Sequence, residues 1–361
     1  MKGNWSIRPY RNGDEEHIRA LFELVFDKHL PTARWQWHYR DNHTGLMAIT
    51  LAEDETGGIV GQCALRPVRM KIGEEIHLGT LQLDSMIHPD FQRQGMFTRL
   101  STHAYKAAAE RGVQLVYSFP NRNSQYVYTH KLGRITLCDR IPLFAKILNV
   151  RNVLDRRIGN RHLLSLVAPV GQAATGILYA LRRGTPSTDC RLEVVARFDE
   201  GVDRLWERAS ASYGILVVRD REYLNWRYVE NPTEEYTLLT AKRFEETVGY
   251  IVLKCESRFG LQMGFIVDML TIPDEPAISG CLISKAVEHF GEKRMDLACC
   301  LMLEHVPYSQ SLRSSGFLIV PERLFPQPLH LSVRRLSEKY TDEFVTDPRN
   351  WFITWGDHDM V

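Results

Sequence analysis

Residues 81–100 read LQLDSMIHPDFQRQGMFTRL, and this stretch decides the expected fold. The apolar residues Leu81, Leu83, Met86 and Ile87 predict a strand over residues 81–88, and Pro89 ends it because proline cannot donate to a sheet ladder. From Gly95 onward the apolar residues recur at helical spacing, which predicts a helix over residues 95–111. Residues 92–95 form the turn between the two elements. The stretch therefore predicts a strand–turn–helix unit of an α/β protein.

The turn has the features of an anion site. The first residues of a helix leave backbone N–H groups unpaired at the positive end of the helix dipole, and such a place binds a diphosphate. Gly95 allows a phosphate to approach the backbone, and Arg93 and Arg99 can add positive charge at the rim. The loop matches neither GxGxxG nor GxxxxGK[ST]. The alternative, an ordinary turn that contains a glycine, stays open at this point.

Composition limits the class of protein. The chain has 361 residues, which favours two domains, and 45 Lys+Arg against 44 Asp+Glu leave a net charge of +1. Without a basic excess, nucleic-acid binding is not expected. The seven cysteines include no CxxC pair, so we expect neither a disulfide framework nor a metal site. The N-terminus lacks the apolar core of a signal peptide, and a cytoplasmic protein is expected.

Strand and helix signals alternate through the first half of the chain. They predict strands at 7–10, 46–51, 59–68, 81–88 and 113–119, and helices at 15–26, 95–111 and 125–132.

The second half repeats the first. The segment WHYRDN at 37–42 resembles WRYVEN at 226–231, an offset of 189. Further landmarks follow in order: Val60-Gly61 matches Val248-Gly249, and Leu83-Asp84 matches Val267-Asp268. Several landmarks in register indicate an internal duplication.

Between the copies lies a basic segment, 140–190, in which residues 162–181 carry no formally charged side chain. That length would span a bilayer, but its polar residues favour a helical hairpin packed between domains over a membrane contact. We therefore expect a first domain at 1–139, a helical linker at 140–190, a second domain at 191–335 and a C-terminal extension at 336–361.

The central turn resembles motif A of the GNAT acyltransferases, in which a hydrophobic strand and a proline precede (Arg/Gln)-x-x-Gly-x-(Gly/Ala). Ile87, Pro89, Gln92 and Gly95 match, and Phe97 stands where glycine or alanine is usual. That departure resembles the branch of multi-domain aminoglycoside and lysine acetyltransferases. The resemblance covers residues 5–138 and extends to 191–335 through the repeat. It implies an α/β fold of two GNAT-like mixed-sheet domains, the second degenerate, joined by a helical linker.

The GNAT resemblance implies an N-acyltransferase that passes an acetyl or other acyl group from acyl-CoA to a primary amine of a small molecule by direct attack, without a metal. Pantetheine is expected to bind the backbone of the strand end as an added strand, with a backbone N–H near Ile87 facing the thioester carbonyl. Asparagines after the next strand would hydrogen-bond pantetheine. The implied acyl-CoA contacts are Met86, Ile87, His88, Gln92, Arg93, Gln94, Gly95, Met96, Phe97, Asn121 and Asn123.

Two proton-transfer roles need side chains. Asp84 and His88 are the candidate bases, although a strand aspartate can also bond a loop and His88 can cap the turn. GNAT proteins often have a tyrosine that acts as the general acid four residues before the glycine that ends the short helix. In this sequence that position is Thr129. Tyr128 is therefore the candidate acid, with Tyr126 as its neighbour, and a purely packing role for either ring stays open.

The acceptor wall in GNAT folds lies between the first helices, where Trp35, Trp37 and Tyr39 could line a pocket. Because Trp226 and Tyr228 recur in the second copy, core packing is favoured for Trp37 and Tyr39.

The second copy has lost the phosphate loop. Asp274 and Glu275 would repel a diphosphate, and Pro276 lacks a backbone donor. We expect this copy to complete the acceptor site or to form a homodimer interface, without binding CoA itself.

Two other readings remain at this point. One is a non-catalytic GNAT pair that senses acyl-CoA or serves as a scaffold, for which Phe97 and Thr129 argue. The other is an aminoacyl transferase of the peptidoglycan-bridge type, against which the intact motif A argues.

Overall fold

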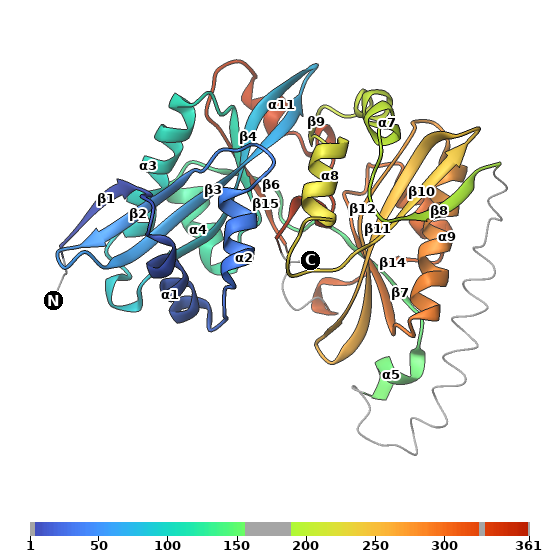
Figure 1. Ribbon diagram of the computed structural model, residues 1–361, viewed down its shortest axis with the longest axis horizontal. Coiled ribbons are helices and arrows are strands. Elements are labelled where there is room, and N and C mark those ends of the chain that lie inside the picture. The colour runs from blue at the N-terminus through green and yellow to red at the C-terminus, as the bar shows by residue number, and fades with distance from the viewer. Residues whose placement is uncertain (1–3, 156–188, 325–328, 360–361) are drawn as a thin grey trace.

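The computed structural model describes residues 4–155, 189–324 and 329–359 and contains two mixed β-sheets with helices packed on them (Figure 1). The first sheet has the strand order β1-β2-β3-β4-β5-β15-β6, with β9 paired to β3 off this path, and the second has the order β14-β7-β13-β12-β11-β10-β8. The expected α/β class with two GNAT-like mixed sheets is therefore confirmed. The strands are β1 (Trp5–Pro9), β2 (Ile49–Asp54), β3 (Ile59–Ile72), β4 (Glu75–Ile87), β5 (Leu115–Ser118), β6 (Ile135–Cys138), β7 (Leu143–Ile147), β8 (Arg191–Val195), β9 (Ile215–Val217), β10 (Thr237–Arg243), β11 (Glu246–Arg258), β12 (Leu261–Thr271), β13 (Leu297–Leu301), β14 (Leu318–Ile319) and β15 (Leu331–Arg335).

The helices that matter most for the site are α1, which precedes the acceptor region, and α3, which follows the central turn. In α3 the residues Met96, Leu100, Ala104 and Ala108 share one buried face, as the helical spacing predicts. The helices are α1 (Glu15–Phe26), α2 (Thr32–Trp35), α3 (Met96–Glu110), α4 (Arg122–Lys131), α5 (Val150–Asp155), α7 (Gly201–Ser210), α8 (Arg221–Tyr228), α9 (Pro276–Glu292), α10 (Tyr308–Ser314) and α11 (Asp342–Thr346), with a π-turn at Gln36–Arg40 and 3₁₀ turns at Pro89–Phe91, Glu322–Leu324, Pro348–Asn350 and Trp355–Asp357.

The two sheets share one pairing register, which supports the duplication seen in the sequence. Arg66 on β3 lies opposite Leu81 on β4, and Lys254 on β11 lies opposite Phe265 on β12. Each of these antiparallel pairs carries a bulge beside an aspartate, Asp84 in the first copy and in the second its counterpart Asp268. The copies are therefore equivalent residue by residue through their central strands.

The two halves exchange a strand. β7 follows the first copy in sequence but lies in the second sheet, between β13 and β14. β15 follows the second copy but lies in the first sheet, between β5 and β6. Each sheet is therefore completed by a strand that the other half of the chain delivers.

This exchange corrects the expected domain boundaries at two places. Residues 143–147, expected within a helical linker, form β7, and residues 331–335, expected in the second domain, form β15. Both segments are only five residues long, so no local signal says which sheet they join. Residues 162–181 lie outside the described residues, and within the described residues no helix has the length and apolarity that crossing a membrane requires.

The halves meet through a reciprocal pair of tryptophans. The rings of Trp37 and Trp226 stack with centroids 4.9 Å apart. Trp37 Nε1 donates to the Trp226 carbonyl at 2.9 Å, and Trp226 Nε1 donates to the Trp37 carbonyl at 3.4 Å. Equivalent residues of the two copies thus bond each other, which is the contact expected across a pseudo-two-fold axis.

Candidate functional site

Strands β4 and β5 diverge where the central turn begins. They pair in parallel only at Thr80–Val116 and Leu81–Tyr117, and no pairing between them follows Leu81 in the part of the chain that the structure describes. The corresponding strands β12 and β13 pair at four positions. The first sheet therefore opens a wedge beside the carboxyl-terminal half of β4, which includes Met86 and Ile87.

The central turn leads from this wedge into α3. Gly95 has φ +77° and caps the helix without a side-chain hydrogen bond, and a Cβ at this position would meet nothing within 4 Å. Side chains brace the turn instead: Gln92 Nε2 donates to the Ile87 carbonyl and Gln94 Nε2 to the Asp90 carbonyl, both at 3.3 Å. The space beside the Gly95 Cα at the start of α3 is thus open, as an anion site requires.

The rim of the turn is basic. Arg93 is exposed with φ 60°, and the Arg99 guanidinium lies 4.3 Å from the centroid of the Trp5 ring. Met96 is buried and Phe97 is half-buried, so only their backbone can serve a ligand at the turn.

Asp84 projects from the bulge of β4 with φ 42°. Its carboxylate accepts a hydrogen bond from the Tyr39 hydroxyl, and its carbonyl accepts one from Gln62 Nε2 at 3.1 Å. Burial, and then the negative charge of Asp359, raise the pKa of Asp84 to about 6, although the hydrogen bond from Tyr39 opposes the shift. A carboxylate of this kind is suited to accept a proton near neutral pH.

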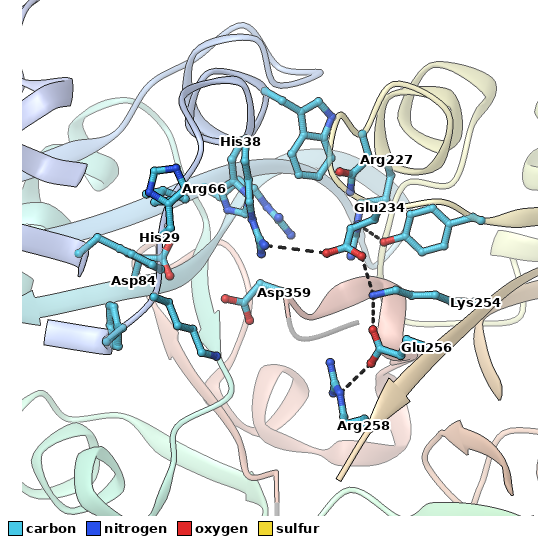
Figure 2. Close-up of a pocket in the computed structure, with 18 of the residues that line it drawn as sticks. His29, His38, Arg66, Asp84, Arg227, Glu234, Lys254, Glu256, Arg258 and Asp359 are labelled. Atoms are coloured by element: carbon cyan, nitrogen blue, oxygen red, sulfur yellow. Dashed lines mark hydrogen bonds and ion pairs between the residues drawn. The ribbon is translucent and has the colours of Figure 1, made fainter. Parts of the chain in front are cut away.

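Asp84 lines a pocket of about 580 Å³ between the two halves (Figure 2). The first half contributes α1, the loop after it, α2, the π-turn, β3 and β4. The second half contributes α8, the loop before β10, β11 and the residue after it, and Asp359. The pocket is lined by Phe22, Phe26, Lys28, His29, Leu30, Arg34, Trp37, His38, Arg66, Asp84, Arg227, Asn231, Glu234, Tyr236, Lys254, Glu256, Arg258, Phe259 and Asp359.

Asp359 enters the pocket from the far end of the chain. Its Oδ1 lies 2.9 Å from His358 Nδ1. Burial pushes the pKa of Asp359 upward, but the interactions with His358, His38 and Arg66 together outweigh it and hold this pKa below its usual range. His38, which also lines the pocket, is neutral because burial, and then the charge of Arg66, hold its pKa well below the usual range. Asp84 and Asp359 therefore differ: one takes up a proton readily, while the other stays ionised.

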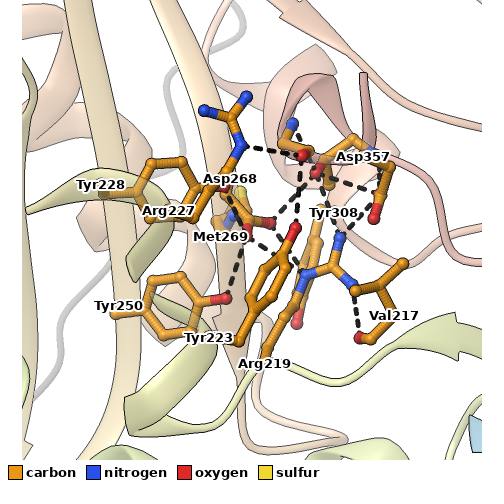
Figure 3. Close-up of polar contacts among 12 residues, drawn as sticks. Val217, Arg219, Tyr223, Arg227, Tyr228, Tyr250, Asp268, Met269, Tyr308 and Asp357 are labelled. Carbon is orange, nitrogen blue, oxygen red and sulfur yellow. Dashed lines mark hydrogen bonds and ion pairs between the residues drawn. The ribbon is translucent and has the colours of Figure 1, made fainter. Parts of the chain in front are cut away.

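A buried ionic cluster holds the C-terminal segment in place (Figure 3). Arg219 is fully buried, with Nε 3.1 Å from Asp268 Oδ1 and Nη2 2.7 Å from Asp357 Oδ2. Thr354 caps the last turn through a capping box with Asp357. Because Asp357 is tied to the second sheet, Asp359 is directed into the pocket.

The cluster also shows how the copies have diverged. The Tyr228 hydroxyl donates to Asp268 at 3.0 Å, which repeats the Tyr39–Asp84 pair of the first copy. Asp268 is neutralised by Arg219 and buried, whereas Asp84 is half-buried and reaches the pocket. Only the first copy therefore presents its aspartate to a ligand.

The other candidate bases and acids lie elsewhere. His88 Nδ1 accepts the Asp90 amide at 3.3 Å and caps the 3₁₀ turn, and His88 is not among the residues that line the pocket. Tyr128 is buried with its ring edge against Phe97 and the Arg134 guanidinium 4.7 Å from its ring centroid, and burial raises its pKa. Tyr126 is 60% exposed and stacks on His130. Of the two tyrosines, Tyr128 is thus the one that packs beneath the central turn.

Among the aromatic acceptor candidates, Trp37 lines the pocket and Tyr39 reaches it through Asp84. Trp35 is buried in the core against Tyr10 and Tyr39 and does not line the pocket.

Two asparagines, Asn121 and Asn123, are the expected pantetheine contacts. Asn121 Oδ1 accepts the Ser124 amide at 3.0 Å and so caps α4. The side chain of Asn123 lies outside the described residues.

The sequence missed Arg66, Lys254 and Asp359. Arg66 and Lys254 occupy equivalent register positions, so the repeat itself could have pointed to them. Asp359 gave no local signal, because its position depends on contacts made by distant residues.

Comparisons with known proteins place these features in a family context. Residues 6–134 match the family model described as an acetyltransferase (GNAT) domain. The search of curated proteins gives no match.

Solved structures resemble the whole chain. A GCN5-related N-acetyltransferase from Anabaena variabilis has a TM-score of 0.64 at 13% identity, over 92% of this chain and 73% of that one. A conserved protein of unknown function and probable N-acyltransferase from Enterococcus faecalis also has a TM-score of 0.64, at 10% identity, with the same coverage of both chains. Saccharomyces cerevisiae N-myristoyltransferase with bound myristoyl-CoA has a TM-score of 0.57 at 9% identity, over 91% of this chain and 79% of that one. At such identities the likeness shows a shared two-sheet fold.

Proposed function

We propose that this chain, whose first half belongs to the GNAT acetyltransferases, is an N-acyltransferase that transfers an acetyl or other acyl group from acyl-CoA to the amine of a small molecule. The observation that carries the proposal is Asp84, which lies on β4 between the acyl-CoA wedge and the pocket. Its carboxylate, with a pKa raised to about 6, stands where an acceptor amine would meet the thioester.

The first half supplies the acyl-CoA side. The N–H groups that begin α3, with Gly95 at φ +77° and no Cβ to cover them, hold the diphosphate. The backbone of Met86–His88, beside the diverging β5, binds pantetheine as an added strand. Acyl-CoA, when bound, supplies the activated acyl group as a thioester. A backbone N–H near Ile87 would donate to its carbonyl oxygen.

The pocket supplies the acceptor side. The Asp84 carboxylate binds the ammonium of the acceptor and takes its proton as the amine attacks. Tyr39, through its hydrogen bond, fixes the orientation of this carboxylate. Tyr128, buried beneath the central turn, is the group that would return a proton to the departing thiolate, because its high pKa keeps the phenol protonated.

The second half does not bind CoA in this proposal. Glu275 occupies the position of the phosphate loop and pairs with Arg243 at 2.6 Å, and Pro276 begins α9. A carboxylate at this helix terminus opposes a diphosphate. We therefore expect calorimetry to give one CoA per chain, and a stoichiometry of two would overturn this assignment.

Thiol release from acetyl-CoA, measured over a panel of primary amines, tests the enzyme itself. Gly95→Glu places a carboxylate at the diphosphate position and should abolish CoA binding. Gly112→Glu is the matched control, since Gly112 ends the same helix with φ +81° and a Cβ there would also meet nothing within 4 Å. If wild type binds no CoA thioester at millimolar concentration, or if both variants lose binding equally, the proposal fails.

A further inference from the structure

Arg66 is a buried cation that lacks a partner among the described residues. It is 1% exposed, and none of its three guanidinium nitrogens makes a hydrogen bond with any residue that the structure describes. The guanidinium carbon lies 5.7 Å from the centroid of the Trp226 ring, a cation–π contact that uses none of its N–H groups for hydrogen bonding. A buried charge without a partner is strongly unfavourable. The residue nevertheless lines the pocket beside His38 (Figure 2).

The position equivalent to Arg66 in the second copy also carries a buried cation, and this cation has ion-pair partners. Lys254, the register equivalent of Arg66, is 6% exposed and is paired with Glu234 and Glu256, each at 2.8 Å. One buried cation thus forms two ion pairs, whereas its counterpart has Asp84 and Asp359 in its surroundings but forms no ion pair within 4.0 Å among the described residues. Because both point into the same pocket, the missing carboxylate of the first copy leaves room for an anion from outside the chain.

The remaining charges of the pocket support this reading. Cations outnumber carboxylates along its lining: Lys28, Arg34, Arg66, Arg227, Lys254 and Arg258 face Asp84, Glu234, Glu256 and Asp359. Glu234 and Glu256 are already paired with Lys254. Asp359 lies against His358, and neither it nor Asp84 comes within 4.0 Å of Arg66 to form an ion pair.

We propose that Arg66 binds an anionic group of the acceptor, so that the acceptor carries a carboxylate or phosphate in addition to its amine. This inference rests on the proposed N-acyltransferase function and specifies its substrate class. Two N–H groups on one edge of a guanidinium match the two oxygens of a carboxylate or phosphate.

The strand geometry limits the spacing of the two groups. Arg66 lies opposite Leu81, three residues before Asp84, which is about 10 Å along the strand. The long arginine side chain shortens this span, so the amine and the anion can belong to one small molecule. A polyamine is disfavoured, because its second ammonium would meet Arg66.

The test compares acceptors that differ only in the anion. Wild type is assayed by thiol release from acetyl-CoA with glycine, β-alanine and γ-aminobutyrate, each beside its primary amide, and with 2-aminoethyl phosphate beside ethanolamine. A charge-assisted bidentate contact predicts that kcat/KM for at least one anionic acceptor exceeds that of its neutral partner by about 10- to 100-fold. The carboxylate and phosphate arms show which anion is preferred.

Variants assign the preference to Arg66. Arg66→Gln should remove the preference by lowering kcat/KM for the anionic acceptor, mainly through KM, more than for its neutral partner, and Arg66→Lys should keep part of the preference. Arg34→Gln is the matched control for lost positive charge, since Arg34 also lines the pocket but lies 3.9 Å from Glu234. The control should keep the preference.

The melting temperature of the ligand-free protein distinguishes a binding role of Arg66 from a structural role. Because Arg66 is an unpaired buried charge, Arg66→Met should raise the melting temperature of the ligand-free protein. A lower melting temperature would indicate a structural cation and contradict the inference. Equal rates for anionic and neutral acceptors would also overturn it, even if Arg66→Gln failed to fold. Absence of turnover and of CoA binding would instead refute the proposed function.

Discussion

Replacing Asp84 by asparagine should remove most of the turnover and stabilise the folded protein. Asparagine keeps the shape and can still accept the hydrogen bond from Tyr39, but it cannot take a proton. The loss of a general base typically lowers kcat by about 10²- to 10⁴-fold. The shift of the pKa of Asp84 from 3.8 to about 6 corresponds to about 3 kcal/mol, which solvent in the open pocket reduces to about 1–2 kcal/mol.

The stability that Asp84→Asn gains over wild type depends on pH. A carboxyl group whose pKa is raised on folding binds more protons in the folded than in the unfolded chain, so wild type loses stability as the pH rises from about 4 to about 6. The advantage of Asp84→Asn should therefore be small at pH 4 and complete above pH 6.

Urea unfolding at several pH values measures the stability difference, and the kcat profile of wild type should rise through about pH 6 as Asp84 ionises. Asp139→Asn, at an exposed aspartate outside the pocket, is the control. An Asp84→Asn protein with wild-type kcat, or with unchanged stability from pH 5 to 8, would refute the assignment of Asp84 as the base.

Three further changes test other parts of the site. Tyr39→Phe removes the hydrogen bond that lowers the pKa of Asp84, so the rise of kcat should move to higher pH; a profile identical to wild type would contradict the role of Tyr39. Gly95→Ala must hold alanine at φ +77°, which should destabilise the protein by about 1 kcal/mol and weaken CoA binding in calorimetry; unchanged affinity would argue against the diphosphate site. Arg219→Met leaves two buried carboxylates without their cation, so urea unfolding should show a loss of about 3–5 kcal/mol; a loss below 1 kcal/mol would show that the cluster does not hold the C-terminal segment.

The local elements of the first half could be predicted from the sequence because their signals are local. The strand into Pro89, the turn through Gly95 and the amphipathic α3 depend on proline, glycine and apolar spacing within twenty residues. The recurrence of Trp37 as Trp226 also predicted a long-range feature, the internal duplication. The common register of the two sheets supports this duplication.

The features that the sequence could not provide depend on distant contacts. Strand β15 pairs with β5 across more than 200 residues, and nothing in LSVRR distinguishes the two sheets it could join. The aligned positions of Arg66 and Lys254 were visible in the repeat, but only the structure shows that Lys254 has carboxylate partners and Arg66 has none.

The exchanged strands also determine when the protein can fold during its synthesis. The first sheet keeps a gap between β5 and β6 until residues 331–335, about 200 residues later in the chain, leave the ribosome. A nascent first half therefore exposes two unpaired strand edges, which favours aggregation and delays folding. Neither half is therefore expected to be stable when expressed alone, because each sheet needs a strand from the other half.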